Sequence, residues 1–410
     1  MQIRGKSKLG EIINFINGRA FKPSEWELKG TPIIRIQNLN GSKEFNFFNG
    51  DIESKYIVKD NQLLFSWSGS RGTSFGPHIW SGETGVLNQH IFRVVPKKKI
   101  NEKYLYYELK RLTREIEHNA HGSAGLVHIT KGDLEQFEIY LPEEREQEKI
   151  AKILSTIDLN IEKTAEAIAK YKQVKKGLMD DLLTGKIRIK DGKWVKETEF
   201  KYVEGIGNIP TTWEVKMLSD ITTFIKDGTH GTHNDIPGGI PLLSAKDIYN
   251  NKVNIPADCR RISYEDYSNI HKKYIIQKND ILLTIVGTIG RAASVSDINT
   301  RFTVQRSVSI IRVNSENIGK YILNYINFYK YQNQLDRLVN ASAQGGIYLG
   351  TLGTTLIVIP DKEEQNEISD ILEKQEQLIE KEEQYLKKLQ KLKSGLMDDL
   401  LTGRKRVNID

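Results

Sequence analysis

The chain has 410 residues, of which 38 % are apolar and 28 % charged, with a formal net charge of +7 and one cysteine. This length exceeds a single compact core and predicts two or three domains, and the apolar share excludes a chain that is disordered throughout. The one thiol, Cys259, excludes an internal disulfide and a zinc site of four cysteines, which favours a reducing cytosol. No run of about 18 apolar residues occurs and no apolar segment follows the charged start, so we expect a soluble cytoplasmic protein without a signal peptide.

The excess positive charge lies in two separate blocks of the chain. Residues 1–141 contain 20 Lys and Arg against 15 Asp and Glu, and residues 186–359 contain 22 against 16. Residues 142–185 contain 8 against 9, and residues 360–410 contain 10 against 13. The two basic blocks fit polyanion binding and, equally well, an ordinary lysine-rich surface in water, so charge alone leaves both interpretations open.

The first block predicts a mixed α/β domain. Short apolar segments between Gly, Asn and Asp turns are typical of strands, and they occur at 32–37, 62–67, 90–95 and 137–141. A helix is expected at 104–118, with a counterpart at 321–339 in the second block.

The segment 142–185 predicts one long helix. Apolar residues recur at alternating steps of 4 and 3 from Ile150 to Leu182, the spacing of a heptad seam, with polar breaks at Thr164 and Lys175. Pro142 precedes this helix and Gly185 follows it. A helix of about 40 residues is about 60 Å long and must pack against something.

The same helix recurs 218 residues later, at 360–403. The nonapeptide GLMDDLLTG at Gly177–Gly185 returns unchanged at Gly395–Gly403, and 21 of 48 positions are identical between 142–189 and 360–407. Nine consecutive identities exclude chance, so the chain contains an internal duplication. The two long helices are the obvious partners for one another, and the pattern itself leaves the antiparallel and parallel arrangements open.

The two basic blocks also repeat, but more faintly, because their apolar residues agree while their polar residues differ. The duplication predicts the order globular domain, long helix, globular domain, long helix. The expected boundaries are a first domain at 1–141, a helix at 142–185, a polar linker at 186–210, a second domain at 211–359, a helix at 360–403 and a C-terminal tail at 404–410.

Motifs for catalysis and cofactor binding are missing from the sequence. There is no Gly-Lys-Ser/Thr phosphate loop, no dinucleotide fingerprint, no His-Glu-x-x-His and no Asn-Pro-Pro-Tyr-like motif. His230 and His233 have no Cys or His partners nearby, which favours hydrogen bonds or base contacts over a metal site. The pairs Asp180-Asp181 and Asp398-Asp399 lie near helix C-termini, where the helix dipole disfavours them, so a partner contact or a cap is favoured over a catalytic dyad.

Polar residues beside apolar ones supply candidates for reading nucleic acid. Arg and Lys reach guanine acceptors, and Asn and Gln pair with adenine. On the strand expected at 32–37, alternation with Ile34 and Ile36 would place the polar side chains outward. The candidates in the first domain are Arg35, Gln37, Asn38, Trp67, Ser68, Ser70, Arg71, Asn88, Gln89 and His90, and those in the second are His230, His233, Ser244, Lys246, Asp247, Thr288, Arg291, Gln305 and Arg306.

Each candidate alone is explained equally well as an ordinary exposed loop residue. The comparison of the two copies is the stronger argument, because the apolar frame matches while the outward polar residues differ. This is the pattern expected of two similar modules that read two different base sequences.

Three features occur together: the paired GLMDDLLTG helix ends, the entries Glu146-Gln147 and Glu364-Gln365, and the segment IPTTWEVKML at 209–218. This combination resembles the specificity (S) subunit of type I restriction-modification systems. The resemblance covers the whole chain in the family's order. One departure is the short N-terminus, which lacks the Pro-x-x-Trp lead-in seen after Ile209 and concerns only the order of the first residues.

The resemblance implies a mixed α/β fold: two target-recognition domains joined by two long helices that form an antiparallel coiled coil with internal pseudo-twofold symmetry. It implies a non-catalytic subunit that binds no metal and no cofactor itself and reads a bipartite, asymmetric target in double-stranded DNA. The implied partners are two modification subunits, which use S-adenosylmethionine to methylate adenine, and restriction subunits that use ATP and Mg. We expect Asp180, Asp181, Asp398 and Asp399 to lie at the subunit interface.

Two other classes of protein stay open at this stage. One is a free-standing DNA-binding regulator, although two unlike modules do not suit a palindromic operator. The other is a coiled-coil scaffold whose globular domains bind carbohydrate or protein. An adjacent adenine methyltransferase gene would decide for the specificity subunit.

Overall fold

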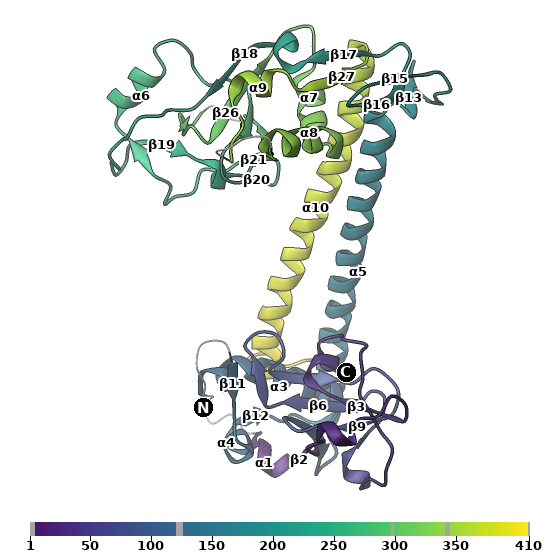
Figure 1. The fold of residues 1–410 in the computed structure, drawn as a ribbon. Coiled ribbons are helices and arrows are strands. Elements are labelled where there is room, and N and C mark those ends of the chain that lie inside the picture. Colours follow the sequence, from purple (N-terminus) through teal and green to yellow (C-terminus); the bar gives the residue numbers. More distant parts are fainter. Residues whose placement is uncertain (1–4, 120–125, 297–298, 341–344, 409–410) are drawn as a thin grey trace. The chain divides into compact units, whose positions relative to one another are not determined.

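Two compact units make up the part of the chain that the computed structural model describes, which is residues 5–119, 126–296, 299–340 and 345–408. Unit 1 comprises Met1–Glu166 with Glu383–Asp410, and unit 2 comprises Ala167–Glu382. Two helices of 40 residues, α5 (Glu144–Leu183) and α10 (Lys362–Leu401), contribute one part to each unit (Figure 1). No helix among the described residues is both long enough and apolar enough to cross a membrane.

Unit 1 holds the first globular module. Its helices are α1 (Leu9–Ile12), α2 (Ile36–Leu39), α3 (Glu102–Asn119) and α4 (Lys131–Gln136). Its strands are β1 (Lys6–Lys8), β2 (Ile13–Asn17), β3 (Thr31–Ile34), β4 (Phe47–Phe48), β5 (Ile57–Val58), β6 (Leu63–Ser66), β7 (Ser68–Ser70), β8 (Gly76–Ile79), β9 (Gly85–Leu87), β10 (Ile91–Pro96), β11 (Leu126–His128) and β12 (Glu138–Tyr140).

The first module is layered as helix, sheet and sheet. The antiparallel sheet β2–β10–β6–β8 carries α3 on one face and a second sheet, β4–β3–β9–β5, on the other. Alternate side chains of β6 serve the two faces, because successive residues of a strand point to opposite sides. Leu63 and Phe65 pack with Leu109 of α3, whereas Leu64 packs with Leu87 of β9.

Unit 2 holds the second globular module. Its helices are α6 (Tyr264–Ile270), α7 (Gly319–Ile326), α8 (Tyr329–Asn340) and α9 (Leu349–Gly353). Its strands are β13 (Ile187–Lys190), β14 (Lys193–Lys196), β15 (Phe200–Val203), β16 (Gly207–Pro210), β17 (Glu214–Met217), β18 (Thr222–Asp227), β19 (Ile240–Leu243), β20 (Ile248–Tyr249), β21 (Lys252–Val253), β22 (Arg261–Ile262), β23 (Ile281–Thr284), β24 (Ala292–Ser294), β25 (Thr303–Val304), β26 (Val308–Val313) and β27 (Leu356–Ile359).

The second module repeats the layers of the first. Its central sheet has the order β18–β26–β23–β24, which matches β2–β10–β6–β8 strand for strand. Leu283 of β23 packs with Ile322 of α7, and Leu282 packs with Leu243 of the second sheet, β22–β19–β25. The predicted mixed α/β fold with two repeated modules is therefore confirmed.

Within each unit, the segments of the two long helices lie side by side and run antiparallel (Figure 1). In unit 2, Lys175 Nζ lies 2.5 Å from a carboxylate oxygen of Glu376. In unit 1, Lys393 pairs with Asp158, at positions 218 residues away from those of the first pair. A lower residue number on α5 is therefore paired with a higher one on α10: Lys175 with Glu376, and Asp158 with Lys393. This confirms the antiparallel coiled coil. Lys175, which interrupts the predicted heptad seam, forms an ion pair with the other helix.

The segment 186–210, expected as a polar linker, forms two β-hairpins. In the first hairpin β13 pairs with β14, and in the second β15 pairs with β16. The polar composition that predicted a linker instead reflects hairpins that expose most of their side chains to water.

The helix expected at 321–339 is broken into α7 and α8. The break falls at Asn327 and Phe328, and the Phe328 side chain is buried in the core. Gln332 Nε2 donates to the Ile326 carbonyl at 2.7 Å and so satisfies an acceptor that the end of α7 leaves without a helical partner.

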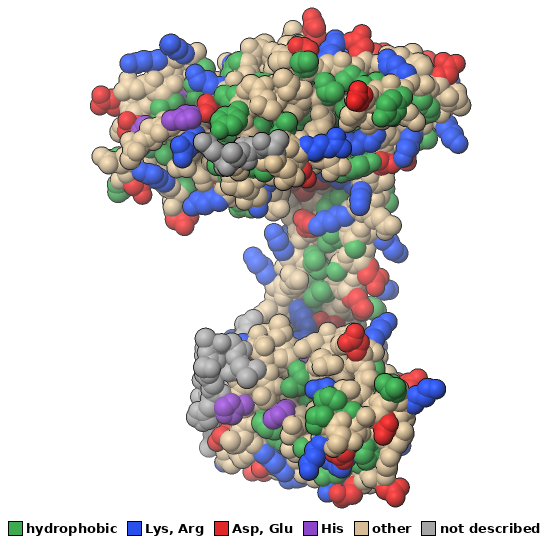
Figure 2. All heavy atoms as spheres, in the orientation of Figure 1, with side chains coloured by type: hydrophobic (Ala, Val, Ile, Leu, Met, Phe, Trp, Pro, Cys, Tyr) green, Lys and Arg blue, Asp and Glu red, His purple; other side chains and the backbone are tan. Residues whose placement is uncertain are grey.

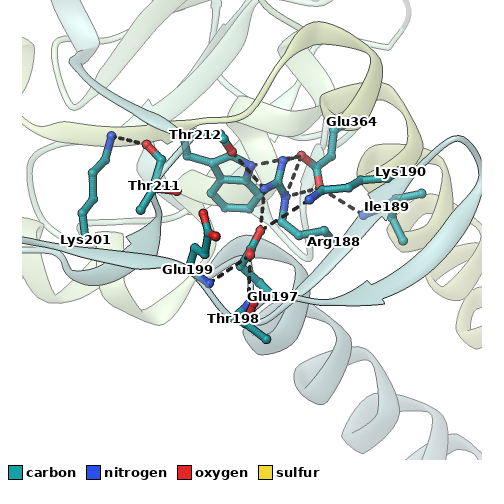
Figure 3. Close-up of polar contacts among 11 residues, drawn as sticks. Arg188, Ile189, Lys190, Glu197, Thr198, Glu199, Lys201, Thr211, Thr212 and Glu364 are labelled. Atoms are coloured by element: carbon teal, nitrogen blue, oxygen red, sulfur yellow. Dashed lines mark hydrogen bonds and ion pairs between the residues drawn. The ribbon is translucent and has the colours of Figure 1, made fainter.

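A buried ion pair joins the start of α10 to the chain that follows α5 (Figure 3). Arg188 donates from Nε to Glu364 Oε1 at 2.7 Å and from Nη2 to Oε2 at 2.5 Å, and both side chains are at most 4 % exposed. The Ile189 amide and the Trp213 indole each donate to the same carboxylate at 3.0 Å. Arg188 also donates to Glu197, and the pKa of Glu197 is lowered to about 2 chiefly by a hydrogen bond from the Glu199 amide.

The same arrangement closes unit 1. Arg406, which follows α10, donates from Nε to Glu146 Oε1 at 2.8 Å and from Nη2 to Oε2 at 2.6 Å. The Val407 amide donates to the same carboxylate at 3.3 Å. We call these two sites, Glu364–Arg188 and Glu146–Arg406, the clasps. They differ in exposure, because the Arg406 side chain is 62 % exposed.

We predict that Glu364→Gln destabilises unit 2 more than Glu146→Gln destabilises unit 1. Removing the Glu364 charge leaves the buried Arg188 with Glu197 as its one remaining carboxylate partner, so Nε and Nη2 lose their charged acceptor, which costs up to about 3–5 kcal/mol. Arg406 can turn into water at a cost of about 1 kcal/mol. Residue-resolved hydrogen exchange at the amides of Ile189 and Val407 reports each opening separately in the full chain. Equal protection losses in the two variants would contradict this ranking.

Glu108 of α3 is a carboxylate buried in unit 1. Tyr104 donates its hydroxyl to Glu108 Oε1 at 2.8 Å, and Arg111 Nε donates to Oε2 at 3.1 Å. Burial raises the pKa of Glu108 to about 7, against the lowering effect of Arg111. The equivalent position in unit 2 holds Tyr325, which is also buried.

We predict that unit 1 loses stability as the pH rises from 5 towards 8, and that Glu108→Gln abolishes most of this loss. The folded pKa lies above the unfolded one, so the protonated carboxyl favours folding, and this contribution is lost as the pH passes through about 7. The difference between wild type and variant should be about 2 kcal/mol over that interval. Denaturant unfolding at several pH values measures this difference in the free energy of unfolding. The hydrogen-exchange protection of amides in unit 2, followed over the same pH range, provides the internal control. A Glu108→Gln variant that keeps the wild-type pH profile would contradict the assignment.

Candidate nucleic-acid interface

Three turns of unit 1 meet at one end of the central sheet. Turn A (18–20) follows β2, turn B (35–38) follows β3, and turn C (88–90) follows β9. Backbone hydrogen bonds join them: Gly18 N to Ile91 O at 3.0 Å, Arg19 N to Leu87 O at 2.9 Å, Gln89 N to Arg19 O at 2.9 Å, and Asn88 N to Ile34 O at 3.0 Å. We call the three turns the turn cluster of the module.

Unit 2 builds the same turn cluster from 228–230, 244–247 and 305–307. All four bonds recur: Gly228 N to Val308 O at 3.1 Å, Thr229 N to Val304 O at 2.9 Å, Arg306 N to Thr229 O at 3.1 Å, and Gln305 N to Leu243 O at 2.8 Å. The two modules therefore hold their turns on one common backbone frame.

A glycine opens turn A in both modules because the chain passes directly against turn C. A Cβ atom on Gly18 would lie 1.9 Å from the Asn88 carbonyl oxygen, and one on Gly228 would lie 2.0 Å from the Val304 oxygen. Backbone atoms cannot yield by that much, so only glycine fits. These two glycines were not among the predicted site residues, although Asn17-Gly18 and Asp227-Gly228 occupy equivalent places in the two halves.

Turn B corrects the predicted strand at 32–37. Strand β3 ends at Ile34, and residues 36–39 form the short helix α2. The Asn38 side chain is buried and accepts the Arg35 amide at 3.0 Å, and in unit 2 the buried Asp247 accepts the Ser244 amide at 2.8 Å. Asn38 and Asp247 therefore hold the turn, and their burial leaves little of either side chain for the predicted base contacts.

Other side chains of turn B are divided between structure and surface. Arg35 is half-buried, donates to Asn46 at 2.9 Å and lies over the Trp26 ring, and Ser244 donates to Asp247 at 3.1 Å. Gln37 and its equivalent Lys246 are the exposed positions of the turn.

The segment around Trp67 is a strand, and the predicted glycine-bounded loop is confined to its end. Ser68 and Ser70 belong to β7, which pairs with β11, while Arg71 is exposed in the following turn. The Trp67 amide donates to the His90 carbonyl at 3.1 Å, and the indole donates to Asn17 Oδ1 at 2.9 Å. Trp67 is therefore a support beneath turns A and C.

The matching segment of unit 2 uses the same backbone contacts. Ile285 replaces Trp67, and its amide donates to the Ser307 carbonyl at 2.9 Å. Thr288 and Arg291 are exposed on the loop between β23 and β24. They are not residues of the turn cluster, although their loop starts beside turn C, where the Ile285 and Val286 amides both donate to Ser307.

Turn C contains predicted residues from both modules. Asn88 forms a parallel bridge with Arg19, as Gln305 does with Thr229. His90 takes a positive φ of 73° and rests against the Trp67 ring at 4.8 Å. The middle residues, Gln89 and Arg306, are exposed.

The histidines of unit 2 make the predicted hydrogen bonds. His230 Nε2 pairs with Asp227 at 2.5 Å, and His233 Nε2 lies 2.9 Å from the Thr229 hydroxyl. His233 Nδ1 also lies 3.2 Å from a carboxylate oxygen of Asp266 in α6. Within the described residues, no group of three or more His, Cys, Asp or Glu side chains is placed to hold a metal ion.

Three of the four aspartates of the two GLMDDLLTG segments form ion pairs within the chain. Lys186 lies 2.5 Å from Asp180 and lowers the pKa of that carboxyl by hydrogen bonding. Asp399 lies 2.9 Å from Lys405 and 3.0 Å from Arg404, and the Lys405 hydrogen bond lowers its pKa. Asp398 is exposed and lies 3.9 Å from Arg404, and Asp181 is half-buried.

The charges do not gather into one basic patch on the visible face. Figure 2 shows Lys and Arg side chains spread over each module with Asp and Glu among them. Recognition that depends on individual turn residues fits this surface better than a broad basic field does.

Comparison with known proteins identifies the family. The model of the type I restriction modification DNA specificity domain matches twice, at residues 5–172 and 210–391. The chain belongs to this family. The MjaVIII specificity subunit of Methanocaldococcus jannaschii is 28 % identical over 98 % of this chain and 92 % of that protein. The EcoBI specificity subunit of Escherichia coli is 28 % identical over 88 % of this chain and 76 % of its own length.

Solved structures share the fold. The type I restriction-modification S subunit of M. genitalium superposes with a TM-score of 0.59 at 15 % identity, covering 97 % of this chain and 95 % of that one. A chain from a structure of the assembly and conformational transition of a type I system gives 0.58 at 13 % identity, with 97 % of both chains covered. The missing Pro-x-x-Trp lead-in raised the question whether the first residues are ordered. Residues 1–4, which this question concerns, lie outside the described residues.

Proposed function

We propose that this chain is the DNA-recognition subunit of a type I restriction-modification complex and reads a bipartite, asymmetric target in double-stranded DNA. One observation carries the proposal: the two turn clusters share a backbone frame, but their exposed side chains differ. A palindromic target presents the same base edges twice and calls for identical side chains in both modules. Unlike side chains on like frames suit two different half-sites.

The relatives support the same function. The matched proteins of M. jannaschii and E. coli are named specificity subunits of type I restriction enzymes. A free-standing DNA-binding regulator and a carbohydrate- or protein-binding scaffold are not favoured by these matches. In this proposal the modules at 1–141 and 211–359 are the target-recognition domains, and α5 and α10 are the spacers between them.

The remaining chemistry is assigned to partner subunits. We propose that two modification subunits bind this chain and methylate adenine with S-adenosylmethionine, and that restriction subunits supply the ATP- and Mg-dependent steps. This chain then needs no catalytic residue and no cofactor of its own, and the complex acts in the cytoplasm.

The GLMDDLLTG segments are the proposed docking sites for the modification subunits. Their leucines are explained by packing inside each unit, where Leu182, Leu183, Leu400 and Leu401 are buried. Asp180 pairs with Lys186, and Asp399 pairs with Arg404 and Lys405, so these two carboxylates are not needed for the leucine packing and are held in place by surface cations. One such site in each half accounts for two modification subunits per chain.

Methylome sequencing of cells that carry the complete system tests the function. We expect one methylated motif with two unlike specific blocks, because the two modules present different side chains. We expect a gap of fixed length between the blocks, since helices of fixed length connect the modules. A continuous or palindromic motif would overturn the proposal.

The docking site is tested by counting subunits with native mass spectrometry. Replacing Asp398 and Asp399 by Ala should lower the number of modification subunits per chain from two towards one, because one acidic site is lost while the other remains. Arg404→Ala combined with Lys405→Ala is the matched control, since it breaks the ion pairs of Asp398 and Asp399 but keeps both carboxylates. A double variant that still binds two subunits with full affinity would remove these aspartates from the interface.

A further inference from the structure

The exposed positions of the two turn clusters can be compared pair by pair. The backbone hydrogen bonds place Ala20 opposite His230 in turn A, Gln37 opposite Lys246 in turn B, and Gln89 opposite Arg306 in turn C. All six residues are exposed, and in turns B and C the residues beside them have the same burial in both modules. The two clusters therefore differ mainly in which side chains they present to water.

Four of these side chains are free to bind a ligand. In the described part of the chain, the side chains of Gln37, Gln89, Lys246 and Arg306 have no hydrogen bond or ion pair with another residue. Their neighbours are engaged instead. Asn38 and Asp247 hold turn B, and Arg19 pairs with Glu25 and stacks over the Phe21 and Phe48 rings.

A free side chain on a rigid turn is well suited to specific recognition. The turns are fixed by four backbone hydrogen bonds and by a glycine that nothing larger can replace. Little backbone entropy is then lost when a turn residue binds, so the contact can discriminate between ligands. An ordinary mobile loop would lose that advantage.

The two modules present different chemistry at equivalent places. The first presents two amides, Gln37 and Gln89, and the second presents two cations, Lys246 and Arg306. A glutamine amide donates and accepts, which matches N7 and the N6 amino group of adenine in the major groove. Lysine and arginine only donate, which matches O6 and N7 of guanine.

We propose that the turn cluster is the base-reading face of each module, that Gln37 and Gln89 read A·T pairs in one half-site, and that Lys246 and Arg306 read G·C pairs in the other. This inference rests on the proposed function. It adds which face of each module meets the bases and which base pairs each half-site contains at the contacted positions.

An exchange variant tests the inference in the assembled complex. Gln37→Lys combined with Gln89→Arg gives the first cluster the cations of the second without altering its frame. Binding of the complex to a DNA library with one half-site randomised, read by sequencing, should show the first half-site changing from A·T to G·C at one or two positions. The second half-site is the internal control and should stay unchanged.

The reverse change separates base contacts from phosphate contacts. Lys246→Gln with Arg306→Gln should cost about 10- to 100-fold in affinity for the cognate second half-site and little for unrelated DNA. Lys278→Gln is the matched control, because Lys278 is an exposed cation before β23, at the end of the central sheet remote from the turn cluster. It should leave the half-site preference unchanged.

The outcomes distinguish this inference from the proposed function. Uniform weakening on all DNA, with a shallower salt dependence, would make Lys246 and Arg306 phosphate contacts and overturn the inference. An exchange variant that keeps the wild-type motif would also overturn the inference. The proposed function would still stand in that case, provided that the wild-type complex selects a bipartite motif. Failure of the wild-type complex to select any bipartite motif would overturn both.

Discussion

The clasps determine how each unit can close. A carboxylate removed from water is tolerated only when charge and hydrogen bonds replace its hydration, and Glu364 receives Arg188, a backbone amide and an indole N–H at once. Glu146 receives the equivalent arginine and amide. Each carboxylate lies at the start of one long helix, and each arginine lies just after the end of the other helix. The charges are therefore neutralised only when the start of one helix meets the segment that follows the other: the β13–β14 hairpin in unit 2 and the C-terminal tail in unit 1.

Behind this constraint, the modules separate residues that build the frame from residues that vary. Asn38 and Asp247 bond to their own turns, and Gly18 and Gly228 allow one turn to pass against another. None of these positions can change freely. The exposed positions beside them make no contact that holds the turns, so substitutions there change the surface without lowering the free energy of unfolding. Duplicated modules can therefore acquire different specificities while keeping one fold.

The helices and their pairing could be predicted from the sequence because a heptad seam and a nine-residue repeat are long, redundant signals. Turn B was predicted wrongly, since Ile34 and Ile36 have the spacing of a strand, while the side chain of Asn38 favours a turn by accepting the Arg35 amide. The break at Asn327 and the hairpins at 187–210 were not predicted either. Each of these features depends on a contact with a residue distant in sequence or on a single side-chain hydrogen bond, which periodicity does not report. The candidate stretches at 35–38, 88–90, 244–247 and 305–306 nevertheless meet in the turn clusters.

The two units differ in continuity, and this sets the order in which they can be completed on the ribosome. Unit 2 is one uninterrupted stretch, Ala167–Glu382, and all of its clasp has been synthesised once Glu364 emerges. Unit 1 combines Met1–Glu166 with Glu383–Asp410, so Glu146 meets Arg406 only after α10 has been made. Unit 1, whose module is translated first, is therefore completed after unit 2, and Glu146 of a nascent chain lacks its arginine partner until Arg406 has been made.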